Sequence, residues 1–239
     1  MKKVSILGIK IHKITVDQAI EKVADFVKEK TPHQIVTVNP EFIMIAQKDR
    51  EFKKVLKEAD LAVADGSGII WASKIVYHPL SERIAGVDLV EKMAKLAHQN
   101  RFSIFFLGAK EGIAQKTSQI LKDKYPKMKV AGYEAGSPHD LSLLGRIKKK
   151  KPDILLVAFG APKQDKWIYK FKNSLGIPVM MGVGGSFDLI SGAVPRAPKW
   201  MQNAGLEWLY RLYREPKRIK RQLSLVKFVY LILKNKSKR

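Results

Sequence analysis

The sequence predicts a Rossmann-like α/β fold, with a mostly parallel sheet that carries helices on both faces and a helical C-terminal appendage. Three observations support this prediction. Short apolar runs alternate with helical patterns, most of these runs are apolar at every position, and the C-terminal segment is basic and amphipathic. A run that is apolar throughout is typical of a parallel strand buried on both faces.

The predicted elements follow one another in a regular order. Residues 1–14 predict a first strand, because Lys10 and Lys13 interrupt the apolar run that a signal peptide needs. Thr15 and Gln18 form a capping box before a helix over 16–29, and a second helical pattern begins at Pro40. Further strands are expected at 34–39, 61–65, 102–108, 128–133, 153–160 and 178–185, and further helices at 111–124, 140–150 and 163–173.

The length and composition limit the kinds of site that the chain can build. At 239 residues it is long enough for one well-buried α/β core and short for two nucleotide-binding domains. We therefore expect a main α/β domain over 1–195 and an appendage over 196–239. The absence of cysteine excludes disulfides and thiolate chemistry, and the five histidines show no metal-ligand spacing, so no metal site is expected.

The formal charge of +23 predicts a polyanionic partner, such as nucleic acid, lipid headgroups or a phosphorylated substrate. Residues 196–239 hold 13 Lys and Arg against 2 Asp and Glu, so nearly half of the excess lies in the appendage. The appendage also carries two apolar stripes at helical spacing. The first includes Leu206, Leu209, Tyr210 and Tyr213, and the second includes Ile219, Leu223, Val226, Tyr230 and Leu233.

A basic amphipathic helix with aromatic residues is suited to an anionic bilayer interface. The apolar stretch over 223–233 contains Lys227 and is too short to cross a bilayer, which takes about 20 residues. Two alternatives compete: docking on the chain's own domain, which we expect for the first stripe, and a basic arm for nucleic acid. The second stripe is too aromatic and aliphatic for a simple nucleic-acid arm. An exposed stripe also favours self-association in solution.

Polar and glycine-rich turns follow most of the predicted strands. Ligands of parallel α/β sheets bind at the carboxyl ends of the strands, and glycine there leaves helix amides free to hold phosphate. Several such turns together indicate a nucleotide diphosphate site, although each alone fits a steric role equally well. Neither a Walker A motif nor a Rossmann fingerprint is present. The turns lie at 37–40, 65–68, 108–110, 160–164 and 182–186.

Individual residues in these turns have more than one interpretation. Asp65 could take a proton from a hydroxyl nucleophile, but its position favours a cap on the helix that begins near Gly68. Thr37 and Asn39 are ordinary turn residues unless the neighbouring loop ends face one cleft. Gln164 could hold a sugar or a phosphate at the start of its helix.

Three further residues near these turns also have a structural interpretation. Arg83 lies in a segment without clear periodicity, for which a surface arginine is the default interpretation. Asp188 either caps a helix or binds a base or ribose edge. Trp167 is expected to pack in the core with Ile168 and Phe171.

Together these segments resemble the WecG/TagA/CpsF family of bacterial glycosyltransferases. The resemblance covers nearly the whole chain, and this many matching segments in order are specific. They are T-V-N at 37–39, A-D-G-S-G at 64–68, R-I-A-G-V-D-L at 83–89, F-L-G at 106–108, F-G-A-P-K-Q at 159–164, G-V-G-G-S-F-D at 182–188, R-A-P at 196–198, G-L-E-W-L-Y-R-L at 205–212 and E-P-K-R at 215–218.

The resemblance implies an inverting, metal-independent glycosyltransferase. It would move N-acetylmannosamine from a UDP donor to the 4-hydroxyl of polyprenyl-diphosphate-linked N-acetylglucosamine, with no cofactor. The chain looks closest to the Gram-positive TagA branch, in which this step leads into wall teichoic acid. Such an enzyme would be cytoplasmic and peripheral on the inner face of the cell membrane, with no nucleic-acid partner.

The resemblance also implies roles for particular residues. Asp65 matches the candidate general base, and donor sugar and phosphates would be contacted by Thr37, Asn39, Arg83 and Gln164. The nucleotide would be served by Asp188 and by the glycines of the turns, Gly108, Gly160, Gly184 and Gly185. Arg214 and Arg221 would neutralise diphosphate charge in place of a metal.

One departure from the family pattern is Asp165, where the family often has glutamate, and we assign it no role. The alternative from another class is a basic nucleic-acid-binding protein or a nucleotide-binding regulatory α/β protein, without transfer chemistry.

Overall fold

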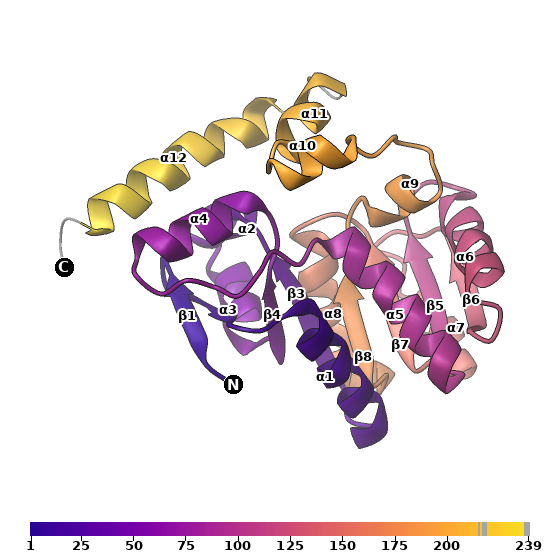
Figure 1. The fold of residues 1–239 in the computed structure, drawn as a ribbon. Coiled ribbons are helices and arrows are strands. Elements are labelled where there is room, and N and C mark those ends of the chain that lie inside the picture. Colours follow the sequence, from indigo (N-terminus) through magenta and orange to yellow (C-terminus); the bar gives the residue numbers. More distant parts are fainter. Residues whose placement is uncertain (215, 217–218, 237–239) are drawn as a thin grey trace.

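The computed structural model describes residues 1–214, 216 and 219–236, with the backbone alone at 211, 220–222 and 236. At its centre lies a six-stranded parallel sheet in the order β4-β3-β8-β7-β5-β6 (Figure 1). The predicted α/β class is confirmed, and the predicted strands of this sheet lie within three residues of their observed bounds. The strands are β3 (His33–Val38), β4 (Leu61–Ala64), β5 (Ser103–Gly108), β6 (Lys129–Glu134), β7 (Ile154–Ala158) and β8 (Val179–Gly182).

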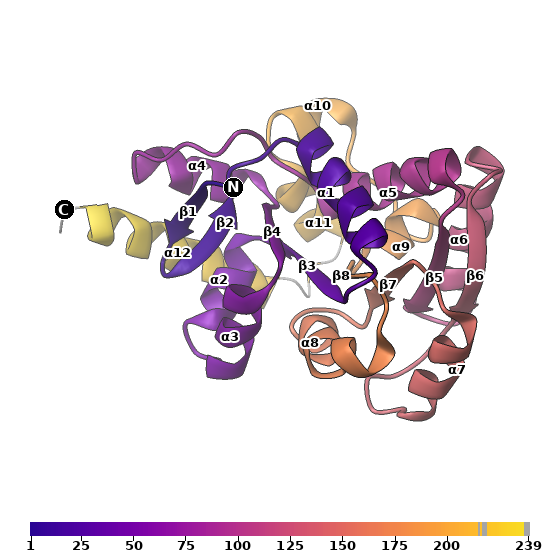
Figure 2. The same ribbon diagram turned by 90° about the horizontal axis from the view of Figure 1, so that it is seen from below.

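Helices cover both faces of the sheet, which explains why most of its strands are apolar throughout. In β7, Ile154 and Leu156 enter the core on one face, and Leu155 and Val157 enter the core on the other. Because successive side chains of a strand point to opposite faces, every position of such a strand is buried. One face carries α1 (Val16–Glu29), α5 (Gly86–Asn100), α6 (Ile113–Lys124) and α9 (Ser186–Ile190), and the other carries α7 (Ser142–Lys150) and α8 (Lys163–Leu175) (Figures 1 and 2).

The N-terminal run forms a hairpin and not the single strand that residues 1–14 predict. Strands β1 (Lys3–Ile6) and β2 (Ile9–His12) pair antiparallel, apart from the main sheet. The connection has positive φ at both Leu7 (48°) and Gly8 (82°), as a two-residue hairpin loop requires. Leucine is unusual there, so the sequence carried no clear turn signal. The hairpin packs in a third core with α2 (Pro40–Ala46), α3 (Arg50–Glu58) and α4 (Ser67–Ile75).

The C-terminal segment forms three helices, α10 (Lys199–Asn203), α11 (Glu207–Arg214) and α12 (Ile219–Lys236). Helix α12 lies along α2 and α4 (Figure 1), where Phe228 and Ile232 are buried in the third core. The appendage therefore docks on its own domain. The predicted second stripe faces outward, because its residues are exposed: Ile219, Leu223, Val226, Tyr230 and Leu233.

Helix α11 exposes part of the first stripe, including Leu209 and Tyr213, although we expected that stripe to dock. The division of the chain at 195/196 stays a prediction. None of the described helices combines the length and the apolar content that a bilayer span requires.

Phe228 and Tyr230 allow a matched test of α12 docking. Both are aromatic and lie on the same helix, but Phe228 is 1% exposed and Tyr230 is 59% exposed. Removing a buried phenyl group costs about 3 kcal/mol or more, so Phe228→Ala should raise tryptic cleavage at Lys227 on the order of 100-fold. Tyr230→Ala should leave the cleavage rate near that of the wild type. Equal cleavage rates in the two variants would show that α12 does not depend on this contact.

Asp165 is an acid buried in the interior of the fold. It lies on α8 and is fully inaccessible, and neither of its carboxyl oxygens has a hydrogen-bond partner among the described residues. The neighbouring Gln34, also fully buried, donates its side-chain amide to the main-chain oxygen of Asp165 at 2.9 Å. Burial raises the pKa of Asp165 to about 7, and the Gln164 side chain offsets only part of this rise.

A raised pKa in the folded state makes stability depend on pH in a defined direction. As pH rises from about 4 to about 7, the unfolded Asp165 ionises while the folded one keeps its proton, so stability falls. Asp165→Asn removes this loss. The difference in unfolding free energy between Asp165→Asn and wild type should therefore grow in favour of the variant as pH rises from about 4 to about 7. The growth should total at most about 4 kcal/mol, and the difference should stay constant at higher pH.

Denaturant unfolding between pH 4 and 8 checks the Asp165 prediction, with Asp123→Asn at an exposed position of α6 as the control. A difference between Asp165→Asn and wild type that stays constant with pH would contradict the assignment.

Candidate active site

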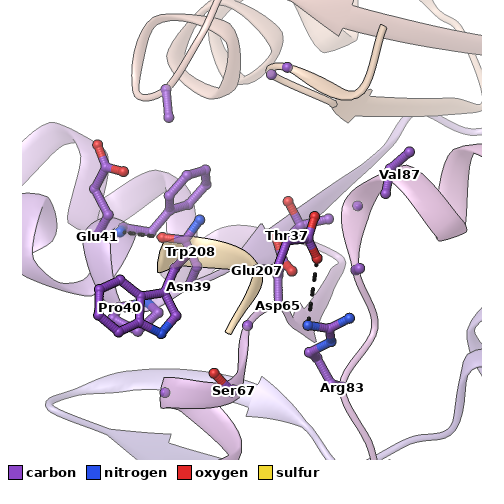
Figure 3. A pocket seen from close by; sticks show the side chains of 18 of the residues that line it. Thr37, Asn39, Pro40, Glu41, Asp65, Ser67, Arg83, Val87, Glu207 and Trp208 are labelled. Atoms are coloured by element: carbon purple, nitrogen blue, oxygen red, sulfur yellow. Dashed lines mark hydrogen bonds and ion pairs between the residues drawn. The ribbon is translucent and has the colours of Figure 1, made fainter. Parts of the chain in front are cut away.

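A cavity of about 590 Å³ lies at the carboxyl ends of four adjacent strands, β4, β3, β8 and β7, under the C-terminal helices (Figure 3). Parallel strands bring their carboxyl ends to one edge of the sheet, so turns far apart in sequence meet there. Eight of the predicted site residues line this cavity: Thr37, Asn39, Asp65, Arg83, Gly160, Gln164, Gly184 and Gly185.

Asp65 is held at the cavity by the sheet itself. Its backbone N–H donates to the carbonyl oxygen of Val38 at 2.8 Å, which extends the pairing of β3 with β4. The N-cap of α4 is Gly66, and no side chain makes a capping bond there, so the interpretation of Asp65 as a helix cap is wrong. Gly66 has φ +86°, a conformation that favours glycine and turns the chain sharply into the helix.

Asn39 and Arg83 reach the cavity by different means. The side-chain oxygen of Asn39 accepts the N–H of Phe42 at 2.9 Å and caps α2, so Asn39 has a structural role as well as a place in the cavity wall. The segment that carries Arg83 runs beside β4, because the N–H of Ile84 donates to the carbonyl of Ala64 at 2.7 Å. This bond brings Arg83 to the same side of the cavity as Asp65 (Figure 3).

Gln164 joins two of the glycine turns. Its side-chain oxygen accepts the N–H of Gly160 at 3.1 Å and the N–H of Gly184 at 3.0 Å. The side chain is 2% exposed. Gln164 therefore fixes the turns after β7 and β8 relative to each other. Gly182 must lack a side chain, because a Cβ atom there would lie 2.6 Å from the Gln164 amide nitrogen.

A chain of alternating charges connects the cavity to the C-terminal segment. Arg83 lies 3.7 Å from Glu207 of α11, and Glu207 lies 4.0 Å from Arg196 (Figure 3 shows the first pair). Arg196 in turn donates both terminal nitrogens to the carboxylate of Asp88, at 2.5 and 2.9 Å. Hydrogen bonding to Asp88 raises the pKa of Arg196. Glu207 was not among the predicted site residues, although it lies within the G-L-E-W segment.

The opposite side of the cavity carries most of its apolar lining, together with the polar side chains of Asn39 and Glu41. Figure 3 places Asn39, Pro40 and Trp208 there, away from Asp65 and Arg83. Further apolar lining comes from α2, α4 and α12, through Phe42, Trp71, Leu225, Phe228 and Val229. Sequence reasoning missed this apolar wall, because it forms only when the C-terminal helices cover α2 and α4.

Three predicted site residues do not line the cavity, and a fourth, Arg221, is not tested. Gly108 ends β5, which lies one strand beyond β7 from the cavity. Asp188 lies in the first turn of α9 with its carboxylate beside Gly185. Arg214 is exposed at the end of α11, and the side chain of Arg221 lies outside the described part of the chain. Among the described residues, no three His, Asp or Glu lie close enough to share a metal ion.

Comparisons with known proteins agree with this arrangement. The sequence model of the family described as "Glycosyl transferase WecG/TagA/CpsF family" matches residues 4–239. An N-acetylglucosaminyldiphosphoundecaprenol N-acetyl-beta-D-mannosaminyltransferase of Bacillus subtilis (strain 168) is 37% identical over 210 residues, which cover 87% of this chain and 82% of the relative. A protein of the same name from Staphylococcus aureus (strain MW2) is 36% identical over 239 residues, which cover 99% and 94%. The chain therefore belongs to the WecG/TagA/CpsF family of glycosyl transferases.

Proposed function

We propose that this protein is an inverting glycosyltransferase that moves N-acetylmannosamine from UDP to the 4-hydroxyl of polyprenyl-diphosphate-linked N-acetylglucosamine. The step belongs to synthesis of the linkage unit of wall teichoic acid. The observation that carries the proposal is a single cavity in which Asp65 and Arg83 face an apolar wall that contains Trp208. The names of the relatives from Bacillus subtilis and Staphylococcus aureus support the same donor sugar and acceptor.

The chemistry needs a base beside the acceptor hydroxyl. The Asp65 carboxylate takes the proton of the 4-hydroxyl while that oxygen attacks the anomeric carbon of the donor. The bond from this carbon to the diphosphate breaks, and UDP leaves with the electron pair. Attack from the face opposite UDP inverts the anomeric configuration. Asp65 then returns its proton to water. Arg83, a cation among the described residues of the cavity wall, would stabilise the charge on the departing diphosphate.

The two walls of the cavity suit the two parts of the acceptor. The side with Asp65, Thr37 and Arg83 presents hydrogen-bonding groups for the sugars and phosphates. The side with Trp71, Trp208 and Phe228 presents apolar surface for the start of the hydrocarbon chain. An acceptor that is polar at one end and apolar at the other would lie across the cavity from one wall to the other.

The outward face of α12 is the surface through which the protein would meet the membrane. Leu223, Val226 and Tyr230 are exposed on this face. Phe228 and Ile232, on the opposite face of the helix, are buried against the domain. This face lies in the basic segment over 196–239. A helix with apolar and basic residues binds an anionic interface, where each basic residue contributes about 1 kcal/mol. The enzyme would thus bind the inner face of the cell membrane, where the lipid-linked acceptor could reach the cavity.

A transfer assay tests the proposed function directly. The full-length protein is incubated with a panel of UDP-sugars and a short-chain lipid diphosphate that carries N-acetylglucosamine. We expect transfer from UDP-N-acetylmannosamine, with an inverted anomeric configuration in the product. Failure of every UDP-sugar on the panel would overturn the proposed function.

Asp65→Asn tests the base. The amide keeps the size of the side chain but cannot take a proton, so kcat should fall by about 100-fold or more. Binding of UDP should remain at the wild-type level, because the substitution leaves the glycine turns in place. Asp123→Asn, at an exposed position of α6, serves as the control. Near-normal kcat in Asp65→Asn would assign proton removal to another group.

The outward face of α12 is tested with the double variant Leu223→Ser/Val226→Ser. Sedimentation with vesicles that contain anionic lipid should drop at least about tenfold, because each buried apolar side chain contributes roughly 1.5–3 kcal/mol. Transfer to a water-soluble acceptor should persist. Ile120→Ser, at an exposed position of α6, is the matched control. Wild-type protein that binds duplex DNA tightly and vesicles not at all, at physiological salt, would favour the nucleic-acid alternative.

A further inference from the structure

The N-terminus of α5 opens into the cavity without a side-chain cap. Its N-cap residue, Ala85, is extended, and Ala85, Gly86 and Val87 line the cavity. The backbone N–H groups of Gly86, Val87 and Asp88 have no hydrogen-bond acceptor among the described residues. The first amides of a helix are donors at the positive end of the helix dipole, where anions bind.

Two hydroxyl groups face the same helix end. One belongs to Thr37, the second-to-last residue of β3, and the other belongs to Ser186, the first residue of α9. Both residues line the cavity, and they are 7% and 6% exposed, respectively. Neither hydroxyl has a hydrogen-bond partner among the residues that the structure describes. Neither hydroxyl oxygen is among the fully buried side-chain atoms that lack a partner, so both are accessible from the cavity that their residues line. A polar ligand would supply the missing partner to both.

Gly86 leaves open the space between the helix end and these hydroxyls. A Cβ atom at position 86 would lie 3.6 Å from Ser186 Oγ and 3.8 Å from Thr37 Oγ1. Those are ordinary van der Waals distances, so a methyl group would fit the fold. It would also occupy the place from which one ligand can reach the helix amides and both hydroxyls.

The charges around this helix end favour an anion. Asp88 is the acid in the first turn of α5, and its carboxylate is already bound by both terminal nitrogens of Arg196. Arg83 lies just before the helix and lines the same cavity. Arg83 and Glu207 form an ion pair, but the 3.7 Å between them is too long for a hydrogen bond. The N–H groups of the Arg83 guanidinium therefore remain able to donate to a ligand.

We propose that the N-terminus of α5, with Thr37 and Ser186, is a phosphoryl-binding site that holds one phosphate of a diphosphate substrate. The proposal deepens the function proposed above, on which the choice of a diphosphate rests. A phosphate group has several acceptor oxygens, so it can take hydrogen bonds from the amides and from both hydroxyls at once. Donor and acceptor both carry a diphosphate, and the titrations below distinguish them.

Gly86→Ala is the sharpest variant, because it fills the site while alanine favours the helix. Gly145→Ala is the matched control, since Gly145 is also helical, on α7, and an added Cβ would meet nothing within 4 Å. The full-length variants are titrated in a calorimeter with pyrophosphate, UDP, uridine and a short-chain prenyl diphosphate. Gly86→Ala should weaken pyrophosphate binding about tenfold or more and leave uridine binding unchanged, because only the phosphate contacts are lost.

Thr37→Val and Ser186→Ala test the hydroxyls separately. Each removes one hydrogen bond, so each should weaken pyrophosphate binding by roughly 3–10-fold. In the wild-type protein, pyrophosphate should also shift the amide NMR signals of Gly86, Val87 and Asp88. This spectrum keeps the test independent of how the variants fold.

The outcomes separate the two diphosphates and the two proposals. A Gly86→Ala defect for UDP alone assigns the site to the donor, and a defect for the prenyl diphosphate alone assigns it to the acceptor; either supports the site. Wild-type affinities in Gly86→Ala, unshifted amides at the start of α5, or no binding of any diphosphate to wild type would overturn it. If transfer fails with every UDP-sugar while Gly86-dependent pyrophosphate binding persists, only the proposed function fails.

Discussion

The parallel pairing of β3 with β8 is the constraint on which the rest of the structure depends. It joins β3 and β4, which are early in the sequence, to β8, β7, β5 and β6, which come later. The order of strands reverses at this pairing, and the turns on its two sides diverge and leave a crevice at the carboxyl edge. Asp65 and Thr37 enter the crevice from one half, and Gln164 and Gly184 enter it from the other. Without this pairing the candidate active site would not exist.

The C-terminal segment completes the crevice and also faces away from it. Helix α12 buries Phe228 and Ile232 against the domain and exposes Val226 and Tyr230 on the opposite side. One helix can therefore close the apolar wall and present a surface for lipid. The contact of Glu207 with Arg83 extends this coupling to the polar wall. In the function proposed above, a cavity wall that belongs to the same segment as this outward face would suit a lipid-linked acceptor.

Much of the fold could be predicted because its signals are local. The capping box at Thr15 appears in the structure, and every strand of the main sheet was expected from its apolar run. Trp167 packs in the core beside Phe171, as predicted. The hairpin over residues 3–12 was missed because Leu7 is a poor signal for a turn with positive φ. The docking of α12 on the domain through Phe228 and Ile232 was left open, because periodicity alone does not say which face of a helix meets the domain.

The sequence by itself determined the strands of the main sheet, the basic appendage and eight residues of the cavity wall. It did so because periodicity, caps and strand-end turns depend on neighbours in the chain, and because the family motifs are carried by those turns. Only the tertiary structure decided that Asp65 leaves α4 uncapped, that Gly108 lies one strand too far from the cavity, and that Glu207 meets Arg83. These outcomes depend on strand order and on helix docking, which bring together residues distant in sequence and are set by packing of the whole chain.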